Sequence, residues 1–157
     1  MSNNLSHVDQ KGNPTMVDVS EKKSSKRIAT AQSKVIVNDK ILGALKDGDI
    51  YTKKGPVFHT AIIAGVMGAK KTSELIPFCH PIALEDCKVE ISIKNNIIVI
   101  DTVAITTGKT GVEMEAITAA TVAALTIYDM CKALSHDIIL SETKLISKTG
   151  GKSDFHR

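Results

Sequence analysis

Residues 87–107 read CKVEISIKNNIIVIDTVAITT, and this stretch decides the fold. Over residues 87–93, apolar side chains alternate with charged or polar ones, which is the two-residue period of a strand with one buried face. Asn95 and Asn96 follow, and asparagine tolerates the left-handed backbone angles of a tight turn. A β-rich run over residues 97–107 comes next. The stretch therefore predicts a β-hairpin.

The segments on both sides of this hairpin complete a regular order. We expect a strand over residues 27–37, connecting structure over 40–54 with room for a short helix, and a helix over 58–71. Beyond the hairpin we expect a long helix over 115–134 and a last strand over 137–147. The order β-α-β-β-α-β is the ferredoxin-like pattern, an α+β fold with an antiparallel sheet and two helices on one face.

The length of 157 residues suits one domain. We expect a flexible N-terminal arm over residues 1–25, a ferredoxin-like domain over 26–148 and a mobile C-terminal tail over 149–157. The longest uncharged apolar stretch, residues 116–128, is too short to span a bilayer and suits a buried helix. No membrane partner is therefore expected.

Composition narrows the possible partners and the compartment. The net charge of +3 is too small to argue for nucleic acid by itself. A sheet that binds RNA uses aromatic side chains to stack bases, and residues 87–93 and 97–107 contain none. Three cysteines without paired spacing argue against a disulfide framework or a zinc ribbon, which favours a reducing cytoplasm.

Four charged residues flank the long apolar helix. Glu113 and Glu115 precede it and lie on one face if their segment is extended, whereas Asp129 and Lys132 are neighbours near its other end. Glu115 and Asp129 are separated by about 21 Å along a helix axis. Either they contact different ends of a large ligand, or the second end belongs to another subunit. The alternative is a surface ion pair at one end and a capping carboxylate at the other.

Other short motifs leave their alternatives open. Residues 108–110 suggest a P-loop, but Val103 stands where that motif needs glycine. Cys79 and His80 lack the partner spacing of a structural zinc site, so His80 is a hydrogen-bonding group or a proton shuttle. Lys54, just before the first long helix, either contacts a phosphate or belongs to a solvated loop.

Taken in order, these segments resemble one family, the cyclic pyranopterin monophosphate synthases of molybdenum cofactor biosynthesis, or MoaC family. The resemblance runs from about His7 to Ser153 and rests on long motifs. These are residues 7–9 with Gly12 and Pro14, residues 16–20 with Lys22, and residues 70–81, 107–116, 125–133 and 148–153.

The resemblance implies a ferredoxin-like fold and a lyase activity. The substrate would be 3′,8-cyclised dihydro-GTP, made by a radical S-adenosylmethionine GTP 3′,8-cyclase, and the products would be cyclic pyranopterin monophosphate and pyrophosphate. It also implies a homohexamer, a trimer of dimers, with active sites between subunits. No cofactor is required on this interpretation, and any Mg²⁺ would arrive with the triphosphate.

The resemblance also assigns roles to individual positions. Asp129, Lys54 and Lys132 fall on the family's catalytic aspartate and lysines. The substrate-binding positions are Phe78, Cys79, His80, Glu113, Met114 and Glu115, together with the basic residues Arg27, Lys22 and Lys148 for the triphosphate. The chain departs from the family's usual Lys-Gly-Asp at Lys54-Gly55-Pro56, which removes a possible N-cap aspartate and leaves the geometry near Lys54 open. Gln32 also replaces a glycine that is often found there.

Overall fold

The computed structural model describes residues 8, 9 and 11–157. The beginning of the expected arm, residues 1–7 and residue 10, lies outside the described residues. The elements in chain order are β1 (Ser25–Ile36), α1 (Asp39–Leu42), β2 (Leu45–Lys46), β3 (Asp49–Thr52), β4 (Gly55–Pro56), α2 (Val57–Lys70), α3 (Thr72–Leu75), β5 (Asp86–Lys94), β6 (Ile97–Gly108), α4 (Glu113–Cys131), β7 (Ile139–Thr149) and β8 (Phe155–His156).

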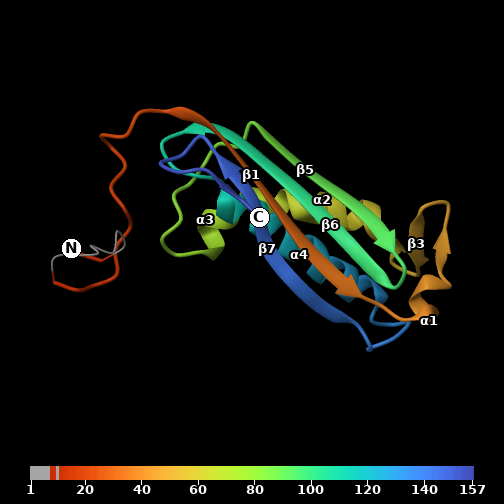
Figure 1. The fold of residues 1–157 in the computed structure, drawn as a ribbon. Helices are drawn as coiled ribbons and strands as arrows, with labels where there is room; N and C mark the ends of the chain where they lie inside the picture. The colour runs from red at the N-terminus through yellow and green to blue at the C-terminus, as the bar shows by residue number, and fades with distance from the viewer. Residues whose placement is uncertain (1–7, 10) are drawn as a thin grey trace.

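The main sheet has the strand order β5-β6-β1-β7-β8, and every neighbouring pair is antiparallel. Its four long strands, with α2 between β1 and β5 and α4 between β6 and β7, form the predicted β-α-β-β-α-β unit. The α+β ferredoxin-like prediction is confirmed. Figure 1 shows the two long helices behind the sheet, with the N-terminal segment extending away from it.

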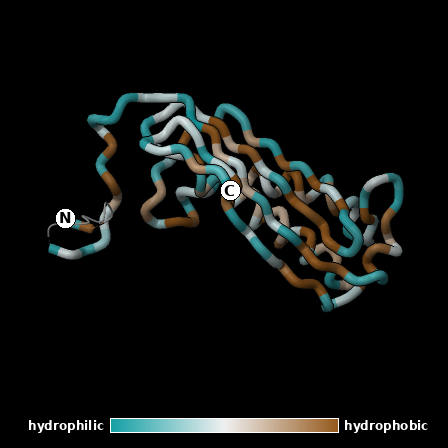
Figure 2. Tube along the Cα trace, in the orientation of Figure 1, coloured by the Kyte–Doolittle hydropathy of each residue, from teal (hydrophilic) through white to brown (hydrophobic). Residues whose placement is uncertain are grey.

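The central hairpin forms as its sequence indicates. Strands β5 and β6 pair from Asp86 opposite Ile105 to Lys94 opposite Ile97. Asn95 closes the turn with a φ of 56°, a conformation that asparagine adopts at low cost. Figure 2 shows the alternation of hydrophilic and hydrophobic residues along the strands of the sheet. One face of the hairpin is buried, and Ile98 and Ile100 are fully inaccessible there.

The two long helices lie close together on one face of the sheet. A Cβ added at Gly68 would lie 2.8 Å from a methyl carbon of Val122, so only glycine fits at this contact. Helix α4 is long and apolar enough to cross a bilayer by composition alone. However, 56% of its apolar window is buried, including Ala116, Ala120 and Ile127, which identifies it as a core helix.

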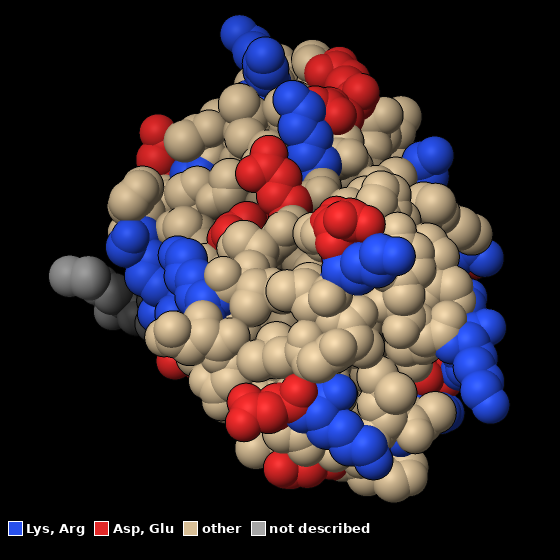
Figure 3. All heavy atoms as spheres, turned by 90° about the vertical axis from the view of Figure 1, so that its right-hand side faces the viewer, with Lys and Arg blue, Asp and Glu red and all other residues tan. Residues whose placement is uncertain are grey.

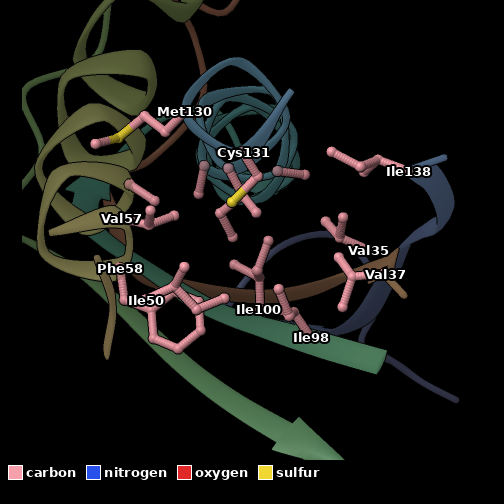
Figure 4. Close-up of a cluster of buried hydrophobic side chains, with 14 of the residues drawn as sticks. Val35, Val37, Ile50, Val57, Phe58, Ile98, Ile100, Met130, Cys131 and Ile138 are labelled. Atoms are coloured by element: carbon pink, nitrogen blue, oxygen red, sulfur yellow. The ribbon is translucent and has the colours of Figure 1, made fainter. Parts of the chain in front are cut away.

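The larger core cluster fills the space between the sheet and one end of the two helices. Figure 4 shows side chains from six places along the chain converging there: Val35 and Val37, Ile98 and Ile100, Val57 and Phe58, Met130 and Cys131, Ile50, and Ile138. This core fixes the end of α4 and the start of α2 against each other. It thereby supports the charged residues that border it.

Three regions differ from the sequence-based expectations. Residues 40–54, expected as a connection with room for a short helix, contain the end of α1 as that short helix, but they also form most of a small sheet, β2-β3-β4, that was not expected. The C-terminal segment, expected to be mobile, contains β8, in which Phe155 pairs with Lys148 of β7. Helix α4 begins at Glu113, two residues earlier than expected, and ends at Cys131. The two-residue strands have too little periodicity to be visible in the sequence.

Candidate active site

Lys54, Asp129 and Lys132 come together at the C-terminal end of α4. One carboxylate oxygen of Asp129 lies 2.7 Å from Lys54 Nζ, and the other lies 2.8 Å from Lys132 Nζ. Lys54 also donates to the backbone oxygen of Asp129 at 3.2 Å. Lys54 comes from the turn between β3 and β4, so the group joins residues 75 positions apart. The three predicted catalytic residues therefore form one cluster.

The three side chains of this cluster are about half exposed to solvent. The hydrogen bonds from Lys132 and then Lys54 lower the pKa of Asp129 to about 2. The same contact with Asp129 raises the pKa of Lys132 above its ordinary value. Figure 3, which faces the end of the molecule carrying β3, shows acidic and basic side chains lying next to one another. Lys132 therefore holds its proton firmly in the free chain, and it can donate that proton near neutral pH only after its contact with Asp129 loosens.

A cavity of about 530 Å³ lies at the opposite end of α4. Its walls come from the N-terminal segment, the loop after α3, the loop before α4 and the first turn of α4. Among the predicted substrate-binding residues it is lined by Lys22, Phe78, Cys79, His80, Glu113, Met114 and Glu115. The structure thus brings together seven of the nine positions that the resemblance assigned to substrate.

Glu113 and Glu115 occupy different environments. They were expected to lie on one face only if their segment is extended, and it is helical. Both lie in the first turn of α4, where residues two apart point in different directions. Glu113 folds back over Gly111, where a Cβ would collide with its carboxylate, and pairs with Lys148 Nζ at 2.9 Å. Glu115 is 3% exposed and lines the cavity. Only the tertiary structure distinguishes the two carboxylates.

Glu115 titrates near neutral pH. Its burial, reinforced by the charge of Glu113, raises its pKa from 4.5 to about 7, although a backbone hydrogen bond acts in the opposite direction. The neighbouring Cys79 thiol has its pKa raised by burial and by the charge of Glu115. A carboxyl group with a pKa close to the working pH is suited to accept and return a proton.

The segment before β1 forms one wall of this cavity and is held by two side chains. His80 Nε2 lies 2.8 Å from the backbone oxygen of Val17, so that nitrogen carries the hydrogen in this contact. Lys109 Nζ donates to the backbone oxygen of Ser20 at 2.7 Å. His80 therefore fixes the wall of the cavity as well as lining it.

A smaller hollow of about 170 Å³ adjoins the cavity and shares Lys22 and Glu113 with it. Its basic lining residues are Lys22, Arg27, Lys109, Lys148 and Lys152. Arg27 Nε donates to the backbone oxygen of Gly108 at 2.9 Å, which leaves the terminal nitrogens of its guanidinium group for other acceptors. Such a concentration of cations suits a polyphosphate.

Three residues that contribute to this region were not among the assigned site residues. Lys109 and Lys152 line the basic hollow, and Val17 forms part of the cavity wall. Lys109 stands between two glycines, a signal that was open to a phosphate interpretation. Among the described residues, no group of three His, Cys, Asp or Glu side chains is placed to hold a metal ion. That no cofactor is required, and that any Mg²⁺ arrives with the triphosphate, stays a prediction.

The fold and these two charged regions define a ferredoxin-like α+β protein with an acid–base cluster and a cation-lined cavity. A sequence profile described as the MoaC family matches residues 16–151. The chain belongs to the MoaC family, as its resemblance indicated.

Three relatives give the extent of the similarity. A cyclic pyranopterin monophosphate synthase from Staphylococcus epidermidis is 52% identical over 162 residues, which cover 98% of each chain. The enzyme of that name from Thermoanaerobacter pseudethanolicus is 48% identical over 155 residues, covering 98% of this chain and 97% of the relative. Molybdenum cofactor biosynthesis protein 1 from Dictyostelium discoideum is 51% identical over 170 residues, covering 97% of this chain but only 27% of that longer protein.

Proposed function

We propose that this chain is a cyclic pyranopterin monophosphate synthase, a lyase that converts 3′,8-cyclised dihydro-GTP into cyclic pyranopterin monophosphate and pyrophosphate. The observation that carries the proposal is the Lys54–Asp129–Lys132 cluster, which joins two distant segments through contacts of 2.7 and 2.8 Å. Relatives of nearly equal length carry the name of this activity. The upstream radical S-adenosylmethionine cyclase would supply the substrate, in the cytoplasm.

The reaction opens a purine-derived ring, rebuilds it as a pterin and closes a cyclic phosphate. Lys132 and Lys54 act as general acid–base groups, and Asp129 orients both ammonium groups. When substrate phosphates displace one of these contacts, a lysine is freed to transfer its proton. Glu115, with a pKa of about 7, is a further proton acceptor or donor within the cavity.

The last step forms one phosphorus–oxygen bond and breaks another. A substrate hydroxyl attacks the α-phosphorus and gives its proton to a basic group of the site such as the Glu115 carboxylate. The bond from the α-phosphorus to the bridging oxygen breaks, and pyrophosphate leaves with the electron pair. Arg27, Lys22 and Lys148 hold the negative charge that develops on the leaving group. Any Mg²⁺ would arrive with these phosphates, since the proposal needs no resident metal.

The two charged regions meet between subunits on this proposal. In one chain they lie at opposite ends of α4, about 21 Å apart along the axis. Exposed apolar side chains on α2 and α4 support an assembly: Ile63, Met67 and Leu125 are 62%, 54% and 56% accessible. A homohexamer, a trimer of dimers, would place the cluster of one copy beside the cavity of another. Gel filtration should then give a mass about six times 16.8 kDa.

The direct test incubates the purified protein with 3′,8-cyclised dihydro-GTP and measures pterin and pyrophosphate. Asp129→Ala and Lys132→Ala should abolish both products while the protein stays folded and oligomeric. Lys88→Ala is the matched control, because Lys88 forms an exposed pair with Asp86 on β5, away from the cluster. Near-wild-type turnover in either cluster variant would show that the assigned roles are wrong.

A further inference from the structure

Asp49, the first residue of β3, is a buried carboxylate outside the two regions described above. It is 2% exposed, and both its oxygens accept hydrogen bonds. Oδ1 accepts from the backbone nitrogens of Ile50 and Phe58, each at 2.7 Å. Oδ2 accepts from the backbone nitrogen of His59 at 3.1 Å and lies 2.7 Å from His59 Nδ1.

Two of these donors are the amides that a helix N-cap residue normally satisfies. Helix α2 begins at Val57, so Phe58 and His59 are its second and third residues. An N-cap side chain accepts from the amides at these positions. The N-cap position here is Pro56, which has no polar side chain and makes no such bond. Asp49 therefore caps α2 from a different segment of the chain.

The same carboxylate fixes the segment that carries Lys54. Strands β3 and β4 pair through Tyr51 with Pro56 and through Thr52 with Gly55, and Lys54 lies in the turn between them. Asp49 is at the start of this hairpin and the amides that it binds lie just after its end. Closing the segment at both ends determines where the Lys54 backbone lies, and its half-exposed side chain reaches Asp129 from there.

We propose that Asp49 is a positioning residue: by capping α2 across the β3–β4 hairpin, it holds Lys54 against Asp129. The catalytic part of this inference rests on the function proposed for Lys54. Burial by itself would raise the pKa of Asp49, but the donors from Phe58, His59 and Ile50 outweigh it and lower the pKa. The carboxylate is thus charged at neutral pH, when its bonds to the amides are strongest.

The test compares Asp49→Asn with the double variant Asp49→Asn/Pro56→Asp. An aspartate at position 56 would supply a local N-cap for the same two amides, and φ −71° with ψ 124° at that position is the extended conformation that an N-cap needs. His59→Ala is the matched control, because it removes the exposed imidazole and leaves both backbone bonds to Asp49 in place.

Three measurements need no substrate. In Asp49→Asn, amide hydrogen exchange at Phe58 and His59 should speed up about five- to tenfold, as expected for a lost N-cap. The Tm should fall by about 2–6 °C, at about 2–4 °C for each kcal/mol in a domain of this size. Acylation of Lys54, read by mass spectrometry against Lys88 as internal reference, should become several-fold faster because the ion pair with Asp129 loosens. The double variant should restore all three values.

Turnover of the cyclised nucleotide tests the catalytic part. In Asp49→Asn, kcat should fall about 10- to 100-fold with a smaller change in KM, since a displaced catalytic group affects the reaction more than binding. The positioning role is wrong if Lys54 acylation in Asp49→Asn is unchanged, or if the double variant does not recover the wild-type acylation rate. If Asp49→Asn does not fold, the double variant tests the proposal on its own. If the double variant also fails to fold, the capping role of Asp49 is wrong. If the wild-type protein shows no turnover, the proposed function is wrong. The amide hydrogen exchange and Lys54 acylation measurements still test the positioning role of Asp49 in that case.

Discussion

Glu115→Gln should stabilise the protein at neutral and alkaline pH but not at acidic pH. Glutamine has nearly the shape of protonated glutamate and is uncharged at every pH. In the folded chain, burial raises the pKa of Glu115 to about 7, whereas the ordinary value is 4.5. That difference corresponds to about 3 kcal/mol, at about 1.4 kcal/mol for each pKa unit. Glu115 is only 3% exposed, so solvent screening reduces this figure little.

The sign follows from where the proton is held. Between pH 4.5 and about 7, folded Glu115 keeps a proton that the unfolded chain has released. The stability that this proton provides is fully present below pH 4.5 and is lost as the pH rises through about 7. The glutamine variant lacks this dependence. Its advantage over wild type should therefore grow across the window and level off above it.

Thermal unfolding of both proteins between pH 4 and 8.5 measures the effect. The Tm of Glu115→Gln should exceed that of wild type by about 6–12 °C at the alkaline end, at about 2–4 °C for each kcal/mol in a domain of this size. All other ionisable groups are common to both proteins, so their contributions cancel in the difference. The control is Glu90→Gln, which removes the charge of an exposed glutamate on β5 and should show no gain that grows with pH. A Tm difference that stays constant or shrinks with rising pH would refute the assignment of Glu115 as a buried, protonated group.

Three further predictions address the basic hollow, the helix contact and the cavity wall. Arg27→Ala should weaken binding of a nucleoside triphosphate about tenfold or more in calorimetry, because a charge-assisted contact is lost; unchanged affinity would exclude Arg27 from the triphosphate site. Gly68→Leu should lower stability by about 1–3 kcal/mol in denaturant unfolding, since the new side chain collides with Val122, and a neutral result would contradict the close helix packing. Lys109→Met should release the segment around Ser20, seen as faster proteolysis there with little change in Tm; an unaltered cleavage rate would show that this contact does not hold the segment.

Much of the fold was predictable because its signals are local. The alternation over residues 87–93 and the Asn95-Asn96 turn specify the β5–β6 hairpin without reference to the rest of the chain. The small β2-β3-β4 sheet was not predicted, because strands of two to four residues carry no measurable period. Its formation depends on contacts such as the burial of Ile50 in the main core.

The candidate site also has some features that the sequence predicted and others that it did not. Family motifs selected Lys54, Asp129 and Lys132 from the sequence, and the structure places their charged atoms in contact. The sequence did not show that the contact with Asp129 raises the pKa of Lys132 in the free chain, because that shift depends on the distance between the two charged groups. The loss of the usual aspartate at Pro56 left the geometry near Lys54 open, and the structure supplies the missing carboxylate from Asp49.

The sequence by itself determined the order of strands and helices, the apolar face of each, and the residue types available for chemistry. These properties depend on neighbours within a few positions, where periodicity and turn preference act. Only the tertiary structure decided that Glu115 is buried while Glu113 pairs with Lys148, and that Asp49 caps a helix that begins eight residues later. Burial and charge pairing depend on segments that are distant in the chain, and these set the pKa values that the chemistry needs.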